Sequence, residues 1–131
     1  MVLASEMDVA ARFDSYFKNL GRSKNEMLSS LETWRMGDIS EGDTKTVKVW
    51  ETEFKAQAIC LNWTESCRIA TVGLDNGWIY CFKFIVSNPK NPIPLLSTKV
   101  HSSRVMKIHY CDDSNHIFSV GADGYLRRVD L

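Results

Sequence analysis

The sequence predicts a mainly β fold built from repeated antiparallel sheets, preceded by a short N-terminal α-helix. From Thr46 onward, short runs alternate apolar and polar residues and are rich in β-branched side chains, which is typical of strands. Turn signals separate most of these runs: Asp75-Asn76-Gly77 and Asp123-Gly124 both suit tight hairpins, because Asn and Gly tolerate positive φ. The segments around these two turns also resemble each other, which indicates an internal repeat.

Composition places the chain among ordinary globular proteins. It has 131 residues, of which 44% are hydrophobic and 24% are charged. Lys and Arg together number 16, as do Asp and Glu, so the formal net charge is zero. We therefore expect no nucleic-acid partner and at most an indirect membrane association. No apolar run approaches the ~20 residues that span a bilayer.

The N-terminal residues carry no recognisable targeting signal. No basic region is followed by an apolar stretch, and Glu6, Asp8 and Asp14 argue against a mitochondrial presequence, which should be poor in acidic residues. The sequence thus predicts a cytoplasmic protein.

Residues 6–20 show the spacing of an amphipathic helix. Val9, Phe13, Phe17 and Leu20 recur at helical intervals, and Gly21 would end the helix. Such a helix would dock on the rest of the chain or on a partner, although aromatic-rich segments of this kind can also form strands. Residues 21–44 are mixed in character. We therefore predict an N-terminal segment over 1–44 and a repeat region over 45–131.

Strand-like runs fill most of the repeat region, and 27–34 could form an earlier strand. The segment 87–94 holds all three prolines and is predicted to be a long surface connection, because proline cannot pair within a central strand. The predicted strands after Trp50 are 57–63, 67–73, 78–84, 95–100, 104–110, 116–121 and 125–130.

The internal repeat aligns 69–77 with 117–124. This alignment places Gly73 opposite Gly121 and Asp75 opposite Asp123. Each copy leads into an alternating strand, and a third such strand ends at Val49-Trp50-Glu51. A period near 40–45 residues with four strands per unit is typical of a β-propeller blade, which predicts a partial propeller of about two to three blades.

These features resemble the WD-repeat family. His101 stands where that family has the His of a Gly-His pair, Ser119 at its hydroxyl-bearing strand position, Asp123 at its turn Asp, and Val129-Asp130 in place of Trp-Asp. The resemblance implies that Asp123 accepts a hydrogen bond from His101, which also bonds Ser119, so that the three side chains fasten strands together. Asp75 would hold the turn position in the middle repeat.

Within that family, the run from Thr46 to Gly124 is most similar to the proteins that join a WD-repeat propeller to a FYVE zinc finger. The residues that carry this likeness are 46–50, 72–77 and 100–105. Such proteins bind phosphatidylinositol 3-phosphate through the finger and lie on endosomes. The chain has no FYVE cysteine cluster, so the likeness implies the propeller role, with an endosomal or phosphoinositide-linked adaptor as the alternative.

Two or three blades cannot close a ring, since propellers typically have about four to eight blades. Their faces would leave apolar side chains in water and their edge strands unpaired. We expect, in this order, that the chain is a piece of a longer propeller, that another chain completes the arc, or that the fold is an irregular stack of small sheets.

The function predicted on these grounds is a non-catalytic scaffold that binds protein partners. The loop 101–104 and the turns 74–78 and 122–125 should lie on one face, where Arg104, Trp78 and Tyr125 are residue types that anchor interfaces. The alternative for Trp78 and Tyr125 is that they fill contacts between blades.

No catalytic or metal-binding constellation is evident in the sequence. The four cysteines have no CxxC spacing and no metal-ligand spacing with the three histidines, so they are expected to be free and buried. Asp112 and Asp113 are adjacent and should lie in a turn rather than form a catalytic pair. We therefore predict no enzymatic activity, no metal and no cofactor. The Lys/Arg groups at 18–24 and at Arg127-Arg128 are expected to be solvated surface rather than a lipid site.

Overall fold

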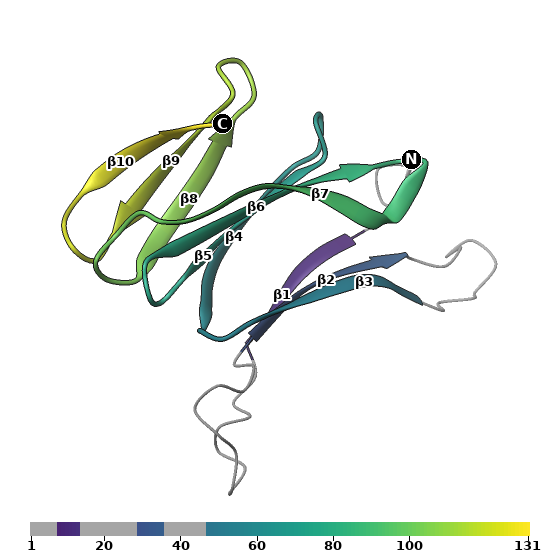
Figure 1. The fold of residues 1–131 in the computed structure, drawn as a ribbon, viewed down its shortest axis with the longest axis horizontal. Coiled ribbons are helices and arrows are strands. Elements are labelled where there is room, and N and C mark those ends of the chain that lie inside the picture. The colour runs from purple at the N-terminus through teal and green to yellow at the C-terminus, as the bar shows by residue number, and fades with distance from the viewer. Residues whose placement is uncertain (1–7, 14–28, 36–46) are drawn as a thin grey trace, which may run out of the picture.

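The computed structural model describes residues 8–13, 29–35 and 47–131, and within them every regular element is a β-strand. Ten strands form three antiparallel sheets that follow one another along the chain (Figure 1). The strand orders are β1-β2-β3, β4-β5-β6-β7 and β10-β9-β8. The prediction of a mainly β fold is therefore confirmed.

The strands of the three sheets have the following bounds. The first sheet contains β1 (Asp8–Phe13), β2 (Ser29–Arg35) and β3 (Val47–Phe54). The middle sheet contains β4 (Ala58–Thr64), β5 (Ile69–Leu74), β6 (Trp78–Ile85) and β7 (Asn88–Lys99). The last sheet contains β8 (Val105–Cys111), β9 (His116–Gly121) and β10 (Leu126–Asp130).

The N-terminal helix predicted over 6–20 is wrong where the structure describes it. Residues Asp8–Phe13 form β1, which pairs with β2 from Asp8↔Trp34 to Phe13↔Ser29. The remainder of the predicted helix lies outside the described residues. Val9, Ala11 and Phe13 also alternate with period two, so the segment suits either structure, and pairing with β2 decides between them.

The proline-rich segment is a strand rather than a connection. Residues 88–94 belong to β7, which pairs with β6 through Phe82↔Pro94 and Lys83↔Ile93. Since β7 is the outermost strand of its sheet, the missing N–H groups of its prolines can lie on the unpaired edge. The prediction failed because proline excludes a central strand but not an edge strand.

The first sheet is built from both sides of the boundary predicted at residue 44, because β2 pairs with β3. The short connection Lys55–Gln57 joins β3 to β4, just as residues 100–104 join β7 to β8. In addition, β3 packs against β7. β3 therefore occupies the position of a last strand in its sheet. We predicted that the strand ending at 49–51 is equivalent to those at 78–84 and 125–130, but in the structure its position corresponds to that of β7 rather than to that of β6 or β10.

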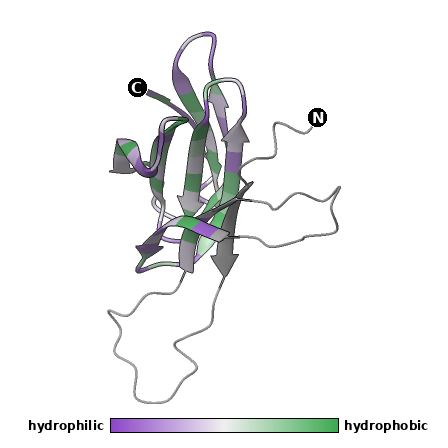
Figure 2. Cartoon of the chain, turned by 90° about the vertical axis from the view of Figure 1, so that its right-hand side faces the viewer, coloured by the Kyte–Doolittle hydropathy of each residue, from purple (hydrophilic) through white to green (hydrophobic). Residues whose placement is uncertain are grey.

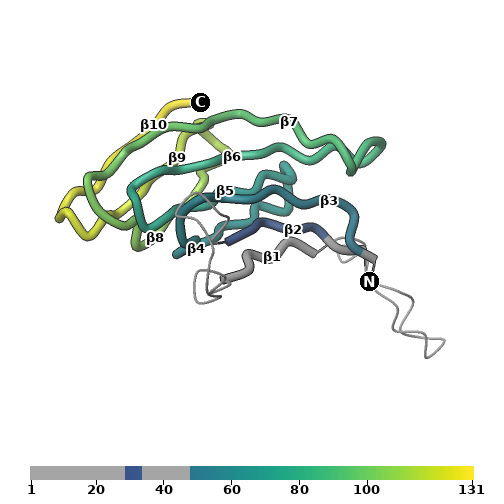
Figure 3. The backbone as a smooth tube through the Cα atoms, turned by 60° about the horizontal axis from the view of Figure 1, so that its bottom comes forward, coloured from purple at the N-terminus to yellow at the C-terminus, as the bar shows by residue number. Residues whose placement is uncertain are grey.

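The core lies on both sides of the middle sheet, whose strand β5 is buried along its whole length. Figure 2 shows the hydrophobic residues along these central strands, and Figure 3 shows the sheets succeeding one another from β1 to β10. One cluster joins the middle sheet to Leu31 and Phe54 of the first sheet. The other joins it to Val105, Ile108 and Ile117 of the last sheet.

A buried serine fastens the first sheet to the start of the middle sheet. The Ser29 hydroxyl donates to the carbonyl oxygen of Ala56 at 2.6 Å and accepts from the backbone N–H of Ala58 at 3.1 Å. Ser29 is fully buried, so both bonds lie out of water, where an unmade bond would be costly.

Matching turns in the middle and last sheets fix the true register of the repeat. Gly77 and Gly124 have φ of 88° and 87°, and their N–H groups donate to the carbonyls of Leu74 and Gly121. Equivalent bonds run from Phe84 N to Arg68 O and from Leu131 N to Asn115 O.

The structural register is one residue out of step with the register predicted from the sequence. Gly77 matches Gly124, so Leu74 matches Gly121 and Asn76, rather than Asp75, matches Asp123. The sequence alignment matched the Val-Gly pair that both repeats contain. The shape of the turn depends instead on the glycine with positive φ, so the equivalent residues are Gly77 and Gly124.

Gly77 is constrained by space as well as by its backbone conformation. A Cβ placed there would overlap the carbonyl of His101, whereas a Cβ at Gly124 would meet nothing within 4 Å. The two glycines therefore form a matched pair that separates backbone strain from steric overlap.

We predict that Gly77→Ala destabilises the fold by about 1–3 kcal/mol more than Gly124→Ala. Both substitutions carry the cost of positive φ, and only the first forces the His101 backbone to move. Urea unfolding of the two variants and the parent chain measures the difference. Equal losses would show that the turn of β5–β6 does not contact the His101 loop.

Candidate functional site

The connections at one end of the sheets form a single continuous surface. Antiparallel pairing brings the β3–β4, β5–β6, β7–β8 and β9–β10 connections to the same end, on the left of Figure 1. We call residues 55–57, 75–77, 100–104 and 122–125 the rim.

Backbone hydrogen bonds hold the rim loops to one another. The Gly77 carbonyl accepts from the N–H groups of Val100 and His101, at 2.9 and 3.2 Å, which ties the middle sheet to the loop before β8. The Arg104 carbonyl accepts from Ala122 N at 2.9 Å, which ties that loop to the β9–β10 turn. The rim is consequently a fixed surface rather than a set of independent loops.

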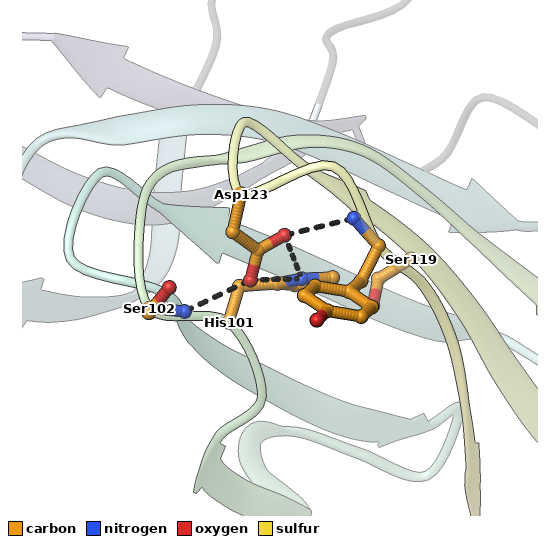
Figure 4. Close-up of polar contacts among 5 residues, drawn as sticks. His101, Ser102, Ser119 and Asp123 are labelled. Carbon is orange, nitrogen blue, oxygen red and sulfur yellow. Dashed lines mark hydrogen bonds and ion pairs between the residues drawn. The ribbon is translucent and has the colours of Figure 1, made fainter.

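A buried chain of side-chain hydrogen bonds lies under the last part of the rim. His101 Nδ1 is 3.0 Å from Asp123 Oδ1, and His101 Nε2 is 2.8 Å from the Ser119 hydroxyl (Figure 4). His101 is 2% exposed and Ser119 is 1% exposed. We call His101, Ser119 and Asp123 the clasp, because it joins the loop before β8 to β9 and to the β9–β10 turn.

Asp123 also accepts two backbone hydrogen bonds, from Ser102 N at 3.0 Å and from Tyr125 N at 3.1 Å. Burial raises the pKa of this carboxyl, but the bonds from Ser102, Tyr125 and His101 outweigh that effect and lower the pKa below its ordinary 3.8. The ionised carboxylate carries no proton, so His101 Nδ1–H is the donor. In the neutral ring, Nε2 then accepts from the Ser119 hydroxyl.

Gly121 makes room for the clasp. A Cβ at this position would overlap the His101 ring and approach Asp123 Oδ1 to 2.7 Å. In the sequence, Gly121 served only to align the two repeats. A glycine at the end of a strand, two residues before the Asp of a turn, is nevertheless typical of a place where another group approaches the backbone closely.

At the junction of the first and middle sheets, apolar side chains fill the corresponding positions. Phe54 stands where His101 does, four residues before the next strand, and Val72 stands where Ser119 does. Phe54 is 4% exposed and packs on Tyr80, with ring centroids 4.9 Å apart. Of the hydrogen bonds described around Asp123, the one within the turn has an equivalent here: Trp78 N donates to Asn76 Oδ1 at 3.2 Å, as Tyr125 N does to Asp123.

Asp75 does not join the clasp. Its side chain is exposed, and its backbone N–H donates to the Gln57 carbonyl at 2.8 Å. The position that we assigned to Asp75 belongs to Asn76.

The three predicted partner-binding residues differ in exposure. Arg104 is exposed, and Tyr125 is 58% exposed, with the Arg127 guanidinium 4.8 Å from its ring centroid. Trp78 is half-buried, stacks on Tyr80 at 6.2 Å and packs against the first core cluster. Arg104 and Tyr125 thus offer more free surface than Trp78 does.

Several of the described side chains are of the types that enzymes use for catalysis or for metal binding. The Ser119 hydroxyl is buried within the clasp, so it does not face a substrate. Burial raises the pKa of Cys60 to about 11 and of Cys81 to about 12, which keeps both thiols protonated at neutral pH. Asp112 accepts from the Ser66 hydroxyl at 2.9 Å, across the opposite end of the sheets. Over residues 8–13, 29–35 and 47–131 no group of three His, Cys, Asp or Glu side chains is arranged to hold a metal ion.

Solved structures with the same fold include a WD40 domain and two structures of a coat. The C-terminal WD40 domain of Sif2 matches with a TM-score of 0.68 and 14% identity, over 96% of this chain and 31% of that chain. Two structures of the COPII coat on membranes, one of its outer coat vertex, each match with a TM-score of 0.61 and 22% identity over 80% of this chain. No family model and no curated protein matches the sequence.

These comparisons identify the fold as part of a β-propeller of the WD40 type. The chain spans less than a third of the length of the solved chains that it matches. None of the residues that the structure describes belongs to a helix of the length and apolarity needed to cross a membrane.

We predict that His101→Ala lowers the stability of the fold by about 1–3 kcal/mol, because it leaves a cavity and strips the buried Ser119 hydroxyl of its partner. Ser119→Ala is the matched control. It removes the same bond but leaves the ring in place, so it should cost less. Thermal unfolding measures both, and an unchanged melting temperature in His101→Ala would contradict the fastening role.

Proposed function

We propose that the chain is a non-catalytic protein-interaction scaffold whose partner-binding surface is the rim, centred on Arg104 and Tyr125. One observation carries the proposal. The rim loops are tied together by backbone hydrogen bonds, while the side chains of Arg104 and Tyr125 are exposed on them, with the Arg127 guanidinium over the Tyr125 ring. Exposed side chains on a rigid set of loops are the usual basis of a binding surface.

The spacing of the two residues suits a protein contact. The Arg104 carbonyl bonds Ala122 N and the Tyr125 carbonyl bonds Gly121 N, so the two residues flank the end of β9 on opposite sides. Neighbouring strands are about 4.8 Å apart, so the backbones of Arg104 and Tyr125 are separated by roughly 10 Å. Arg and Tyr are among the residues that contribute most binding energy at interfaces.

The proposal includes completion of the propeller by further sheets, in the same protein or in another chain. The chain covers 31% of the Sif2 domain and 26% of the coat-vertex chain, both of which support a larger ring. A cytoplasmic location fits this scaffold role, and the endosomal adaptor stays a sequence-based prediction.

We expect Arg104→Glu to reduce the recovery of protein partners at least severalfold, because it reverses the charge at the centre of the rim. Lys90→Glu is the matched control, since Lys90 is exposed near the start of β7, away from the rim. Affinity purification of the parent chain and both variants, with quantitative mass spectrometry, makes the comparison. Equal recovery from the parent and Arg104→Glu would rule out the rim as the binding surface.

A further inference from the structure

The β5–β6 turn of the rim holds a reactive pair of residues, because Asn76 is the one asparagine in the sequence that precedes a glycine. Its side chain is exposed, and its Oδ1 accepts from Trp78 N at 3.2 Å. In such a pair the backbone nitrogen of the glycine can attack the side-chain amide carbon of the asparagine, since glycine has no Cβ to hinder the approach. The turn therefore contains both the electrophile and the nucleophile for loss of the Asn76 amide group.

The nucleophile is held by a single long hydrogen bond. Gly77 N donates to the Leu74 carbonyl at 3.3 Å, which is longer than most N–H···O bonds in proteins. The equivalent bond in the last sheet, from Gly124 N to the Gly121 carbonyl, is 3.1 Å long. The Gly77 nitrogen is thus the less firmly bonded of the two.

The equivalent pair in the last sheet, Asp123-Gly124, lacks the reactive amide. Asp123 is an ionised carboxylate, and its side chain is only 7% exposed. It is fixed by His101 and by the N–H groups of Ser102 and Tyr125. A carboxylate is a far weaker electrophile than a neutral amide, and it is a group without an amine to expel. The same turn shape therefore carries reactive chemistry in the middle sheet and inert chemistry in the last one.

The other described asparagines are protected in two ways. Asn88 and Asn91 precede prolines, whose nitrogens carry no proton to release. Asn62 and Asn115 precede the bulky residues tryptophan and histidine. Their Oδ1 atoms accept from the backbone N–H and from the hydroxyl of Tyr110, at 3.1 and 2.7 Å respectively. Among the residues that the structure describes, the reactive combination is found at Asn76.

We infer that Asn76 is a site of spontaneous deamidation in the folded protein. The Gly77 nitrogen bonds to Asn76 Cγ, the Cγ–Nδ2 bond breaks, and the proton of Gly77 N leaves with the amide group as ammonia, which closes a cyclic imide. Water then opens the imide at one of its two carbonyls. Attack at Cγ gives aspartate with the original backbone, and attack at the other carbonyl gives isoaspartate. This chemistry needs no partner, so it is independent of the proposed scaffold function.

The two products have different consequences for the rim. Aspartate at position 76 keeps the backbone, adds a negative charge and still accepts from Trp78 N, as Asp123 accepts from Tyr125 N. Isoaspartate runs the main chain through Cγ, so the backbone gains one carbon directly before Gly77. No space exists there, because even a Cβ on Gly77 would overlap the His101 carbonyl.

The longer backbone of the isoaspartate form must therefore displace the loop before β8. The Gly77 carbonyl accepts from the N–H groups of Val100 and His101, and these two bonds tie the middle sheet to that loop. Isoaspartate at position 76 weakens both bonds and loosens the rim, whereas aspartate leaves them intact.

The test incubates the folded full chain at mildly alkaline pH in water enriched in heavy oxygen. Trypsin then places Asn62, Asn76 and Asn115 in different peptides, namely 56–68, 69–83 and 108–127. Mass spectrometry should show the replacement of an amide by a carboxyl group severalfold faster in 69–83 than in the other two. An isoaspartate-specific carboxyl methyltransferase should label the same peptide. Asn76→Asp is the matched control, since it keeps the turn but has no amide to lose, so it should incorporate far less heavy oxygen.

Hydrogen exchange on the separated products tests the effect on the rim. The amides of Val100 and His101 should exchange severalfold faster in the isoaspartate form than in the parent, and at the parent's rate in Asn76→Asp. Unchanged exchange in the isoaspartate form would show that the rim is not loosened. Equal deamidation of the three peptides, or deamidation of 69–83 only after unfolding in urea, would overturn the assignment of Asn76 as a reactive site of the folded protein.

Discussion

Burial of β5 on both faces is the constraint on which the rest of the structure depends. All six of its residues are buried, which requires one sheet on each side of the middle sheet. A four-stranded sheet alone would leave both apolar faces in water, and stacking is how repeat units of this kind acquire a core. The rim follows from the stack, because neighbouring sheets bring their turns to a common end.

The junction between neighbouring sheets is stabilised in two different ways. In the last sheet, His101 joins Asp123 to Ser119 through buried hydrogen bonds. At the junction of the first and middle sheets, Phe54 of β3 and Val72 of β5 occupy the matching positions and contribute apolar packing instead. A buried polar chain stabilises only when every member is satisfied, whereas an apolar cluster depends on shape alone. The same backbone arrangement thus tolerates both kinds of side chain, which explains why one repeat resembles the WD pattern far more closely than the other does.

Much of the fold could be predicted from the sequence, because its strands alternate and its turns carry Gly after Asp or Asn. The contacts of His101 with Ser119 and Asp123 agree with what the family resemblance implied. Other features depend on tertiary contacts that a single sequence does not display. β1 is a strand because β2 pairs with it, and the prolines of β7 are tolerated because that strand lies at an edge. The true repeat register depends on which glycine has positive φ, so Asp75 was chosen where Asn76 belongs.

The stacking of three sheets is tested most directly by amide hydrogen exchange on the full chain. We predict that the amides of β5 exchange most slowly, since that strand is central in its sheet and buried on both faces, and that those of β10, an exposed edge strand, exchange far faster. Exchange in β5 as fast as in β10 would contradict a middle sheet enclosed by its neighbours.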